Sequence, residues 1–355
     1  MTTHSDSTVL VTGATGFIAQ HCILQLLEAG YAVRGTARSL HGADDITSTL
    51  APHLSPAARP LLETHFHVVE ANLNNDEGWD GAMADCRYVL HVASPIPRVP
   101  PKDENELIEP AREGTLRVLR AAHRAGVERI VITSSLAAVL YGQDRDRVFS
   151  ENDWSNVDDP RIGAYEKSKT FAERAARDFM ASLGPNTTMS LVTINPGLVM
   201  GPVLSGDWGT SGELVKKIID RDFPAIPDIN YACVDVRDVA SAHVAAMTTP
   251  DAAGKRFLCA NGNHSMRSIA RVLKDHLGPQ GFKIPTGNLP SAMLRLVALW
   301  DKTARLALND LGVEQNVDTS QIRSALKWEP RDLREMVTSM ADSMIEHGIV
   351  KKKNS

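Results

Sequence analysis

Short apolar segments alternate with amphipathic helical patterns through the first two-thirds of the chain. The apolar segments are rich in valine, isoleucine and leucine, which is typical of strands buried on both faces of a sheet. They cover residues 8–12, 31–37, 66–69, 88–92, 130–133 and 191–194. Helical patterns lie between them at residues 17–29, 106–125 and 164–180. This alternation predicts an α/β fold in which helices cover both faces of a doubly wound parallel sheet.

The pattern changes after Pro196, where strand-like segments become rare. A helical pattern at residues 236–247 and a strand-like segment at 255–260 are expected to return to the sheet. The remaining patterns, at residues 213–221, 265–277, 290–308 and 331–347, predict helices of a second, smaller region. Residues 43–60 are rich in serine, threonine and proline, and we interpret them as a surface excursion.

The composition argues against several kinds of partner. The chain has 38 basic and 43 acidic residues and a net charge of −5, whereas nucleic acid or an anionic membrane would favour a basic surface. No apolar run approaches the roughly 20 residues that a membrane span needs, and the first residues lack signal-peptide features. The four cysteines form no Cys-x-x-Cys pair, so we expect reduced core thiols in a cytoplasmic protein.

A glycine-rich turn follows the first predicted strand and precedes the first predicted helix. Gly13 and Gly16 are spaced as Gly-x-x-Gly, and Ala19 follows three residues later. At this position backbone N–H groups and a helix N-terminus can bind a pyrophosphate, as in Rossmann-type folds. A plain strand–helix turn is the alternative. The dinucleotide interpretation assigns the cofactor to Gly13, Thr15, Gly16, Phe17 and Ile18.

The end of the second predicted strand bears on which dinucleotide binds. NAD binders carry an acid there for the ribose 2′-hydroxyl, but here no acid precedes Asp44. Arg38 lies 22 residues after Gly16, and its guanidinium could pair with a 2′-phosphate. This favours NADP(H) over NAD(H). Arg34 is a weaker second candidate, and a plain surface role for Arg38 is the alternative.

A serine, a tyrosine and a lysine follow in an order that suggests acid–base chemistry. Ser135 ends the fifth predicted strand, and Tyr165 and Lys169 share one face of the next helix. A nearby ammonium would stabilise the phenolate and lower the tyrosine pKa. The other tyrosines, of five in all, have no lysine at this spacing. Tyr165 as a half-buried helix residue is the alternative.

These motifs together make the chain resemble the extended short-chain dehydrogenases/reductases. Within that family it looks most like the group of dihydroflavonol reductases, cinnamoyl-CoA reductases and yeast methylglyoxal (aldehyde) reductases. The resemblance rests on segments that follow in order along the chain, namely residues 11–19, 91–95, 132–135, 165–169, 195–197 and 234–240.

The resemblance implies a role for each matching residue. It makes Ser135, Tyr165 and Lys169 the catalytic triad and Arg38 the 2′-phosphate arginine. Its implied cofactor contacts also include Asn72, Leu73, Ala93, Ser94, Pro196, Leu198 and Val199. Asn72 replaces the usual aspartate near the adenine. A lysine that often follows the arginine is also absent.

Other residues carry weaker hypotheses. Ile96, Leu140 and Trp208 are candidates for the substrate wall, and Tyr231 is a further apolar candidate, although core packing is an equal alternative for each. In flavonoid reductases the position of Leu140 is polar, so leucine argues against flavonoids. His65, His67 and His91 lack metal-ligand spacing, so we expect no metal site. Asp235 and Asp238 flank Arg237, and we expect a salt-bridged support.

The sequence therefore predicts a reversible NADP(H)-dependent reductase of aldehydes and ketones, a small-molecule enzyme that could form a homodimer. Three alternatives are an NAD-dependent sugar-nucleotide epimerase or dehydratase, a hydroxysteroid-type dehydrogenase and a non-catalytic NADP-sensing regulator. The predicted NADP-binding domain comprises residues 1–196, rejoined by 234–260. Residues 197–233 and 261–348 would form a smaller, mostly helical substrate-binding cap, and 349–355 a tail.

Overall fold

The protein is built around a seven-stranded parallel sheet. The computed structural model describes residues 7–40, 44–95, 103–144, 146–300 and 307–352. The strand order in the sheet is β3-β2-β1-β4-β5-β6-β9. These strands are β1 (Thr8–Val11), β2 (Ala32–Ala37), β3 (Phe66–Glu70), β4 (Cys86–His91), β5 (Arg129–Thr133), β6 (Ser190–Pro196) and β9 (Arg256–Cys259). The predicted doubly wound parallel sheet is confirmed, and its strand order reverses between β1 and β4.

The central strands are mostly apolar because the sheet is buried on both faces. In β1, Val9 and Val11 belong to the core cluster that includes Ile23 of the first helix. Leu10 belongs to a second cluster, together with Leu119. Successive side chains of a strand point to opposite faces, so both faces of β1 need apolar residues.

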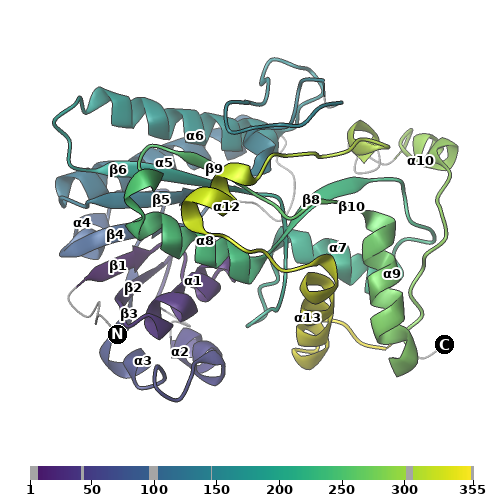
Figure 1. The fold of residues 1–355 in the computed structure, drawn as a ribbon, viewed down its shortest axis with the longest axis horizontal. Coiled ribbons are helices and arrows are strands. Elements are labelled where there is room, and N and C mark those ends of the chain that lie inside the picture. The colour runs from purple at the N-terminus through teal and green to yellow at the C-terminus, as the bar shows by residue number, and fades with distance from the viewer. Residues whose placement is uncertain (1–6, 41–43, 96–102, 145, 301–306, 353–355) are drawn as a thin grey trace.

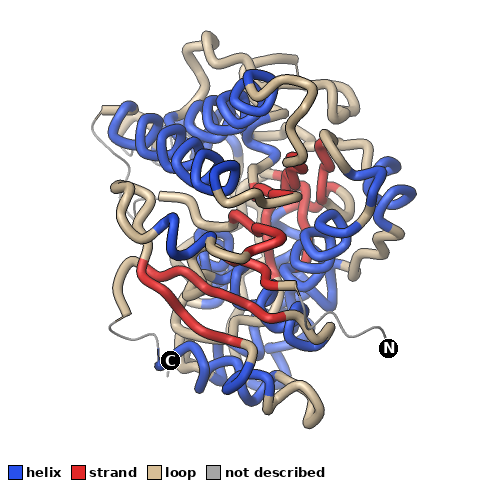
Figure 2. Tube along the Cα trace, turned by 90° about the vertical axis from the view of Figure 1, so that its left-hand side faces the viewer, coloured by secondary structure: helices blue, strands red, loops and turns tan. Residues whose placement is uncertain are grey.

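Two layers of helices cover the sheet (Figure 1). Helices α4 (Trp79–Met83), α5 (Asn105–Arg124) and α6 (Ala164–Ser182) pack together on one face. Helices α1 (Phe17–Glu28) and α8 (Val236–Thr248) pack together on the other. The side view shows strands enclosed by helices on both sides (Figure 2). The layers bring the strand ends together at one edge, where the glycine turn and the candidate catalytic residues lie.

A smaller region lies at one end of the molecule (Figure 1). Its three-stranded sheet has the order β10-β8-β7 and consists of β7 (Leu198–Met200), β8 (Asn230–Asp235) and β10 (Asn263–Ser265). Helices α7 (Gly209–Ile219), α9 (Met266–Leu277) and α13 (Leu333–Glu346) contact one another there. Helix α10 (Ser291–Val297) follows α9 in the chain. The expected cap thus contains a small sheet besides its helices.

Two segments lie differently from what the sequence suggested. Helices α2 (Asp44–Leu50) and α3 (Leu61–Thr64) frame residues 43–60, and Leu50 and Leu54 of this stretch are buried in the main core. The interpretation as a surface excursion is therefore wrong, because its spaced apolar residues cover one edge of the sheet domain. Helix α12 (Ser320–Leu326), inside the expected cap, packs against β9 and α8.

The structure also tests the predictions that the cysteines are reduced core thiols and that no segment is apolar enough to span a membrane. Cys22, Cys86, Cys233 and Cys259 are all buried free thiols, as the sequence predicts. Burial raises the pKa of the Cys86 thiol to about 11, so it stays protonated at neutral pH. Among the described residues, every helix is too short or too polar to cross a membrane.

Candidate active site

The carboxyl ends of five neighbouring strands bring the candidate residues to one edge of the sheet. Gly13 follows β1, Arg38 follows β2, Ala93 follows β4 and Ser135 follows β5, while Pro196 ends β6. In open parallel sheets, ligands bind outside the carboxyl ends at the point where strand order reverses. Here that point lies between the turn after β1 and the loop after β4.

The glycine turn has the geometry that a close phosphate contact requires. Gly13 has a φ of +69°, and a Cβ atom there would come within 3.0 Å of the Ala93 Cβ. The Gly13 amide donates to the Thr36 hydroxyl at 3.1 Å, and the Gly16 amide donates to the Gly13 carbonyl at 2.9 Å. Only glycine fits this left-handed, crowded position without strain.

The N-terminus of α1 presents the positive end of a helix at the turn. Gly16 occupies the N-cap, so no side chain caps the first amides, and the first turn of this helix carries no acid. Unpaired amides and the helix dipole favour an anion at such a terminus. The turn, the missing Cβ atoms and this terminus therefore fit a dinucleotide pyrophosphate.

A buried threonine joins the glycine turn to the loop after β4. The Thr12 hydroxyl accepts from the Val92 and Ala93 amides at 3.0 Å each, and it bonds the His91 Nδ1 at 2.9 Å. Burial lowers the pKa of His91 to about 3, so its ring is neutral. The sequence analysis missed Thr12, which lies directly before the first glycine.

The two arginines of the second strand have different environments. Arg38 is exposed immediately after β2, at the binding edge. Arg34 instead donates to the carbonyls of Ala82 and Ala84 at 2.9 and 2.7 Å, so its guanidinium fixes the end of α4. Arg38 is therefore the arginine that is free to meet a 2′-phosphate.

Asn72 and Leu73 follow β3 at the same edge. The Asn72 side chain accepts from the Asn74 amide at 3.0 Å and thus caps its own turn. Leu73 packs against Gly114 of α5, where an added Cβ would lie 3.1 Å from the Leu73 Cβ. Leu73 also lines the cavity described below.

Ser135 contacts Tyr165 across the gap between β5 and α6. The Ser135 side chain is close enough to the Tyr165 phenol to lower its pKa. Its hydroxyl also accepts from the Ala137 amide at 3.1 Å, because Ser135 caps the short 3-10 helix Leu136–Ala138. The structure thus brings together two members of the predicted triad.

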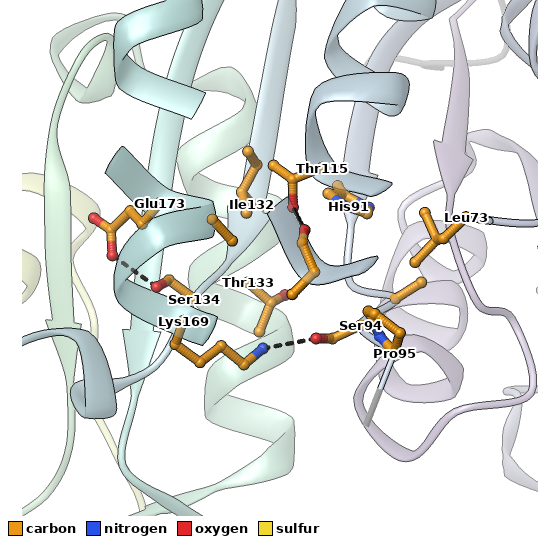
Figure 3. A pocket seen from close by; sticks show the side chains of 13 residues that line it. Leu73, His91, Ser94, Pro95, Thr115, Ile132, Thr133, Ser134, Lys169 and Glu173 are labelled. Carbon is orange, nitrogen blue, oxygen red and sulfur yellow. Dashed lines mark hydrogen bonds between the residues drawn. The ribbon is translucent and has the colours of Figure 1, made fainter. Parts of the chain in front are cut away.

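Lys169 lies one turn after Tyr165 on α6 and points toward the loop after β4 (Figure 3). Its Nζ donates to the Ser94 hydroxyl at 3.1 Å and lies 5.9 Å from the centre of the Tyr165 ring. Burial lowers the pKa of Lys169 to about 8, and the nearby Glu173 acts in the opposite direction. The third member of the predicted triad therefore reaches the same edge.

The pKa of Tyr165 is shifted upward. Burial of the phenol is the main cause, and the Ser135 hydrogen bond partly counters it. The net direction is opposite to the one expected from Lys169 alone, because burial outweighs the neighbouring groups. The phenol is consequently protonated at neutral pH.

A small cavity lies between the ends of β4 and β5 and the helices α5 and α6 (Figure 3). Ser94, Thr115 and Lys169 contribute polar atoms to its wall, and Ile132 contributes apolar ones. Lys169 and Ser94, which are hydrogen-bonded to each other, both line this cavity. The lysine therefore has open space next to its side chain.

The segment predicted to line the nicotinamide begins at the end of β6. Pro196 and Val199 are buried and Leu198 is half-buried. Gly197 lies between them, and an added Cβ there would come within 2.0 Å of the Ala232 carbonyl oxygen. This close approach lets β7 leave the main sheet and pair with β8.

The substrate-wall candidates have different environments. Leu140 is fully buried in a core cluster with Phe149 and Leu258, away from the cavity. Trp208 precedes α7, and its indole N–H donates to Glu213 at 3.2 Å. Tyr231 is half-buried on β8, and Ile96 lies outside the described residues.

The first helix also anchors the loop that follows β7. The Gln20 side-chain amide donates both to the Thr15 carbonyl and to the Ser205 hydroxyl, at 3.1 Å each. The next residue, His21, bonds the Pro202 carbonyl oxygen at 2.9 Å. The contacts to Ser205 and Pro202 join segments about 180 residues apart, and no pattern in the chain predicts them.

The remaining charged candidates are structural. Asp235 caps α8 and pairs with Arg237 at 2.7 Å, and Asp238 pairs with Arg331. The expected salt-bridged support is confirmed. Over the ranges that the structure describes, no three metal-ligating side chains form a cluster.

Comparisons with known proteins agree with this geometry. Cinnamoyl-CoA reductase 1 of Arabidopsis thaliana is 36% identical over 79% of this chain and 78% of its own length. A Candida albicans protein named as an NADPH-dependent methylglyoxal reductase is 32% identical over 80% of this chain and 87% of its own. The crystal structure of the yeast methylglyoxal/isovaleraldehyde reductase with NADPH superposes with a TM-score of 0.78 at 26% identity. It covers 97% of this chain and 100% of that one.

The match to a protein family covers most of the chain. Residues 9–260 fit the NAD dependent epimerase/dehydratase family. They include the glycine turn, the Ser135–Tyr165 pair, Lys169 and the strands that position them. The chain therefore belongs to the NAD dependent epimerase/dehydratase family of extended short-chain dehydrogenases/reductases.

Proposed function

We propose that this protein is an NADP(H)-dependent oxidoreductase that reduces aldehydes and ketones to alcohols and catalyses the reverse oxidation. The observation that carries the proposal is that Ser135 acts on the Tyr165 phenol while Lys169 lies 5.9 Å from the centre of its ring. Relatives across the family are named as reductases, and the yeast enzyme binds NADPH in its crystal. The fold-level match alone would leave the reaction open.

The cofactor would lie along the carboxyl edge of the sheet. Gly13, Gly16 and the N-terminus of α1 would hold the pyrophosphate, and Arg38 the 2′-phosphate. Thr15, Phe17, Ile18, Asn72, Leu73, Ala93, Ser94, Pro196, Leu198 and Val199 remain predicted contacts. When bound, the reduced nicotinamide supplies the two electrons and one hydrogen that the carbonyl carbon gains.

The chain's own residues would handle the proton. Tyr165 is protonated at neutral pH and would donate its phenolic proton to the carbonyl oxygen. Ser135 would hold that oxygen through its hydroxyl. Lys169 would stabilise the tyrosinate that remains and would bind the ribose hydroxyls through its ammonium.

A substrate panel tests the activity directly. Purified protein is mixed with NADPH and a series of aliphatic and aromatic aldehydes, ketones and hydroxyketones, and loss of NADPH absorbance is followed. We expect turnover with several aldehydes and a weaker rate with NADH. No turnover with any carbonyl compound, in a protein that binds NADPH, would contradict the proposal.

A second measurement separates the reductase from an epimerase or dehydratase. Those enzymes keep NAD bound through purification, whereas a reductase must exchange its cofactor at every turnover. The exposed Arg38 in place of an acid after β2 favours exchangeable NADP(H). We expect the denatured protein to release no stoichiometric NAD.

The partner and location follow from the same proposal. The substrate is a small carbonyl compound or alcohol, and we propose neither nucleic acid nor a membrane as a partner. A homodimer and a cytoplasmic location stay predictions. Size-exclusion chromatography with light scattering would test the first, and fractionation of the source cells the second.

A further inference from the structure

Glu173 is a buried carboxylate one helical turn after Lys169 on α6 (Figure 3). Its side chain is 1% exposed. One carboxylate oxygen accepts from the Ser134 hydroxyl at 2.6 Å and from the Asn195 amide at 2.8 Å. The other accepts from the Arg256 guanidinium at 2.6 Å. A carboxylate buried this deeply needs such a full set of donors.

The carboxylate reaches the predicted catalytic serine through Asn195. The Asn195 amide that donates to Glu173 also donates to the backbone carbonyl of Ser135, at 3.2 Å. Ser134, the residue before Ser135, donates its hydroxyl to the same oxygen of Glu173. Both contacts hold the backbone at the end of β5, and therefore the direction in which the Ser135 hydroxyl points.

The arginine on the opposite side extends the network to the segment that precedes α6. Arg256 donates to the carbonyls of Glu151 and Asp153 at 2.7 Å each. Its guanidinium stacks on the Trp154 ring at 3.9 Å. The Glu173–Arg256 pair thus connects α6, β9 and the chain between β5 and α6.

We propose that Glu173 is a positioning residue for the reaction, whose carboxylate fixes the backbone of Ser135 through Asn195 and supplies the negative charge beside Lys169. The inference rests on the proposed function, because it assigns roles to Ser135 and Lys169 as reacting groups. Glu173 itself touches neither substrate nor cofactor in this assignment.

The charges around Lys169 explain why this carboxylate matters. The lysine faces Ser94 and the neutral His91 from β4 and its loop, and Tyr165 and Glu173 from its own helix. Burial lowers the pKa of Lys169, and Glu173 is the neighbour that raises it. Without that charge, the lysine would lose its proton at a lower pH.

Glu173 faces positive groups on its other sides. Arg256 comes from β9, and the Arg177 Nε on α6 lies 3.7 Å from the carboxylate. The carboxylate is therefore paired with one guanidinium and lies near a second.

The test replaces Glu173 by glutamine, which keeps the size but removes the charge. The apparent pKa on the alkaline side of the kcat profile should fall by about one unit, as expected for loss of an adjacent opposite charge. Glutamine has one acceptor oxygen for the donors that Glu173 meets with two, so the anchor of Ser135 is weakened. We therefore expect kcat to fall about 10- to 100-fold, while KM for the carbonyl changes less.

A direct titration of Lys169 supplies a readout that does not depend on turnover. Protein labelled with ¹³C at the lysine Cε is titrated without cofactor, and the signal missing in Lys169→Met identifies the residue. The Glu173→Gln variant should show a lower pKa for this signal. An unchanged lysine titration together with an unchanged kcat profile would overturn the proposal.

Asp238→Asn is the matched control, because Asp238 is also a buried carboxylate paired with an arginine, Arg331. Both substitutions should lower the unfolding midpoint, since each removes a buried carboxylate that pairs with an arginine. Only Glu173→Gln should move the Lys169 titration. If both variants shifted the pKa of Lys169 equally, Glu173 would only stabilise the fold and the proposal would be wrong.

A double variant covers the case in which Glu173→Gln does not fold. Glu173→Gln with Arg256→Gln removes both members of the close ion pair, so no Arg256 guanidinium is left buried without its partner. Glu173 is the member of that pair that acts on the pKa of Lys169, so the downward shift should persist. A wild-type lysine titration in the double variant would overturn the proposal.

The same set of proteins separates the two proposals. If Tyr165→Phe retained full turnover, the proposed acid–base function would fail, whatever the lysine titration showed. If Tyr165→Phe were inactive and Glu173→Gln behaved as the wild type, only the role of Glu173 would fail.

Discussion

The Ser135 side chain acts on the Tyr165 phenol and lowers its pKa, although the two residues come from a strand end and from the helix 30 residues later. This contact joins β5 to α6 at the carboxyl edge of the sheet. A carbonyl oxygen placed beside these two residues could accept a hydrogen bond from each hydroxyl group. This gives the pair its proposed role in proton transfer.

Replacing Tyr165 by phenylalanine removes the phenolic proton and little else. We expect kcat to fall by about 100- to 10,000-fold, the usual contribution of a positioned acid. The affinity for NADPH, measured by fluorescence titration, should change less than about threefold, because the cofactor phosphates bind elsewhere.

Tyr31→Phe is the control for this substitution. Tyr31 is a buried tyrosine immediately before β2, at the amino end of the sheet and away from the site. It should keep full turnover. A full rate in Tyr165→Phe as well would refute the acid role.

Replacing Arg38 by glutamine should change the choice of cofactor. The exposed guanidinium after β2 would lose a charge-assisted bond to the 2′-phosphate, which we expect to raise KM for NADPH about 10- to 100-fold. KM for NADH should stay nearly constant. Steady-state kinetics with both cofactors measure the ratio.

Arg34→Gln separates cofactor choice from stability. Its guanidinium donates to backbone carbonyls at the end of α4, so this variant should unfold at lower temperature with an unchanged NADPH/NADH ratio. Equal ratios in both variants would show that the 2′-phosphate binds elsewhere.

Replacing Gly13 by alanine combines backbone strain with a steric clash. At a φ of +69° the alanine would be strained, and its Cβ would lie 3.0 Å from the Ala93 Cβ. We expect a loss of about 1–3 kcal/mol in the free energy of unfolding, measured in urea, and weaker NADPH binding.

Gly30→Ala isolates the strain from the clash. Gly30 has a φ of +80° but no atom within 4 Å of an added Cβ. It should lose less stability and bind NADPH normally. If both variants bound NADPH as the wild type does, the turn would not hold the cofactor.

Buried histidines should make the fold sensitive to acid. Burial lowers the pKa of His243 and of His21 to about 4, below the ordinary histidine value of 6.5. In the unfolded chain both histidines are protonated below pH 6.5, whereas in the folded protein they stay neutral until about pH 4. Their contribution to stability is therefore complete above pH 6.5 and is lost as the pH falls toward 4.

The His243→Gln variant tests that sign. Each such histidine changes the unfolding free energy by up to about 1.4 kcal/mol per pH unit between its two pKa values. The variant should be less stable at pH 7, since it loses the Thr133 contact at 2.6 Å, but its stability should fall less steeply with acid. His123→Gln, at an exposed helix position, should leave the slope unchanged.

The sheet could be predicted because its signals are local. Each strand carries its own apolar run, and a glycine turn or a helical pattern marks its end, as at Gly13 after β1. The positions of Tyr165 and Lys169 on one helix face also follow from spacing alone. For Asp235 the neighbouring Arg237 sufficed to predict a salt bridge, whereas Asp238 pairs with Arg331, 93 residues away.

The rest depends on contacts between distant segments. Arg256 and Glu173 are 83 residues apart, and neither stands in a pattern that predicts the other. Strand β7 has three residues, too few for a periodic signal. Leu50 and Leu54 lie in a segment whose polar composition concealed its buried face.

The paired anchors on α1 have a consequence for how the molecule could diversify. Gln20 and His21 tie the loop after β7 to the helix that starts at the glycine turn. Helix α1 therefore holds both that loop and the glycine turn. The distance between them does not depend on the rest of the cap. Residues farther along the cap, such as those around α10, can vary without changing the distance between the glycine turn and the loop after β7.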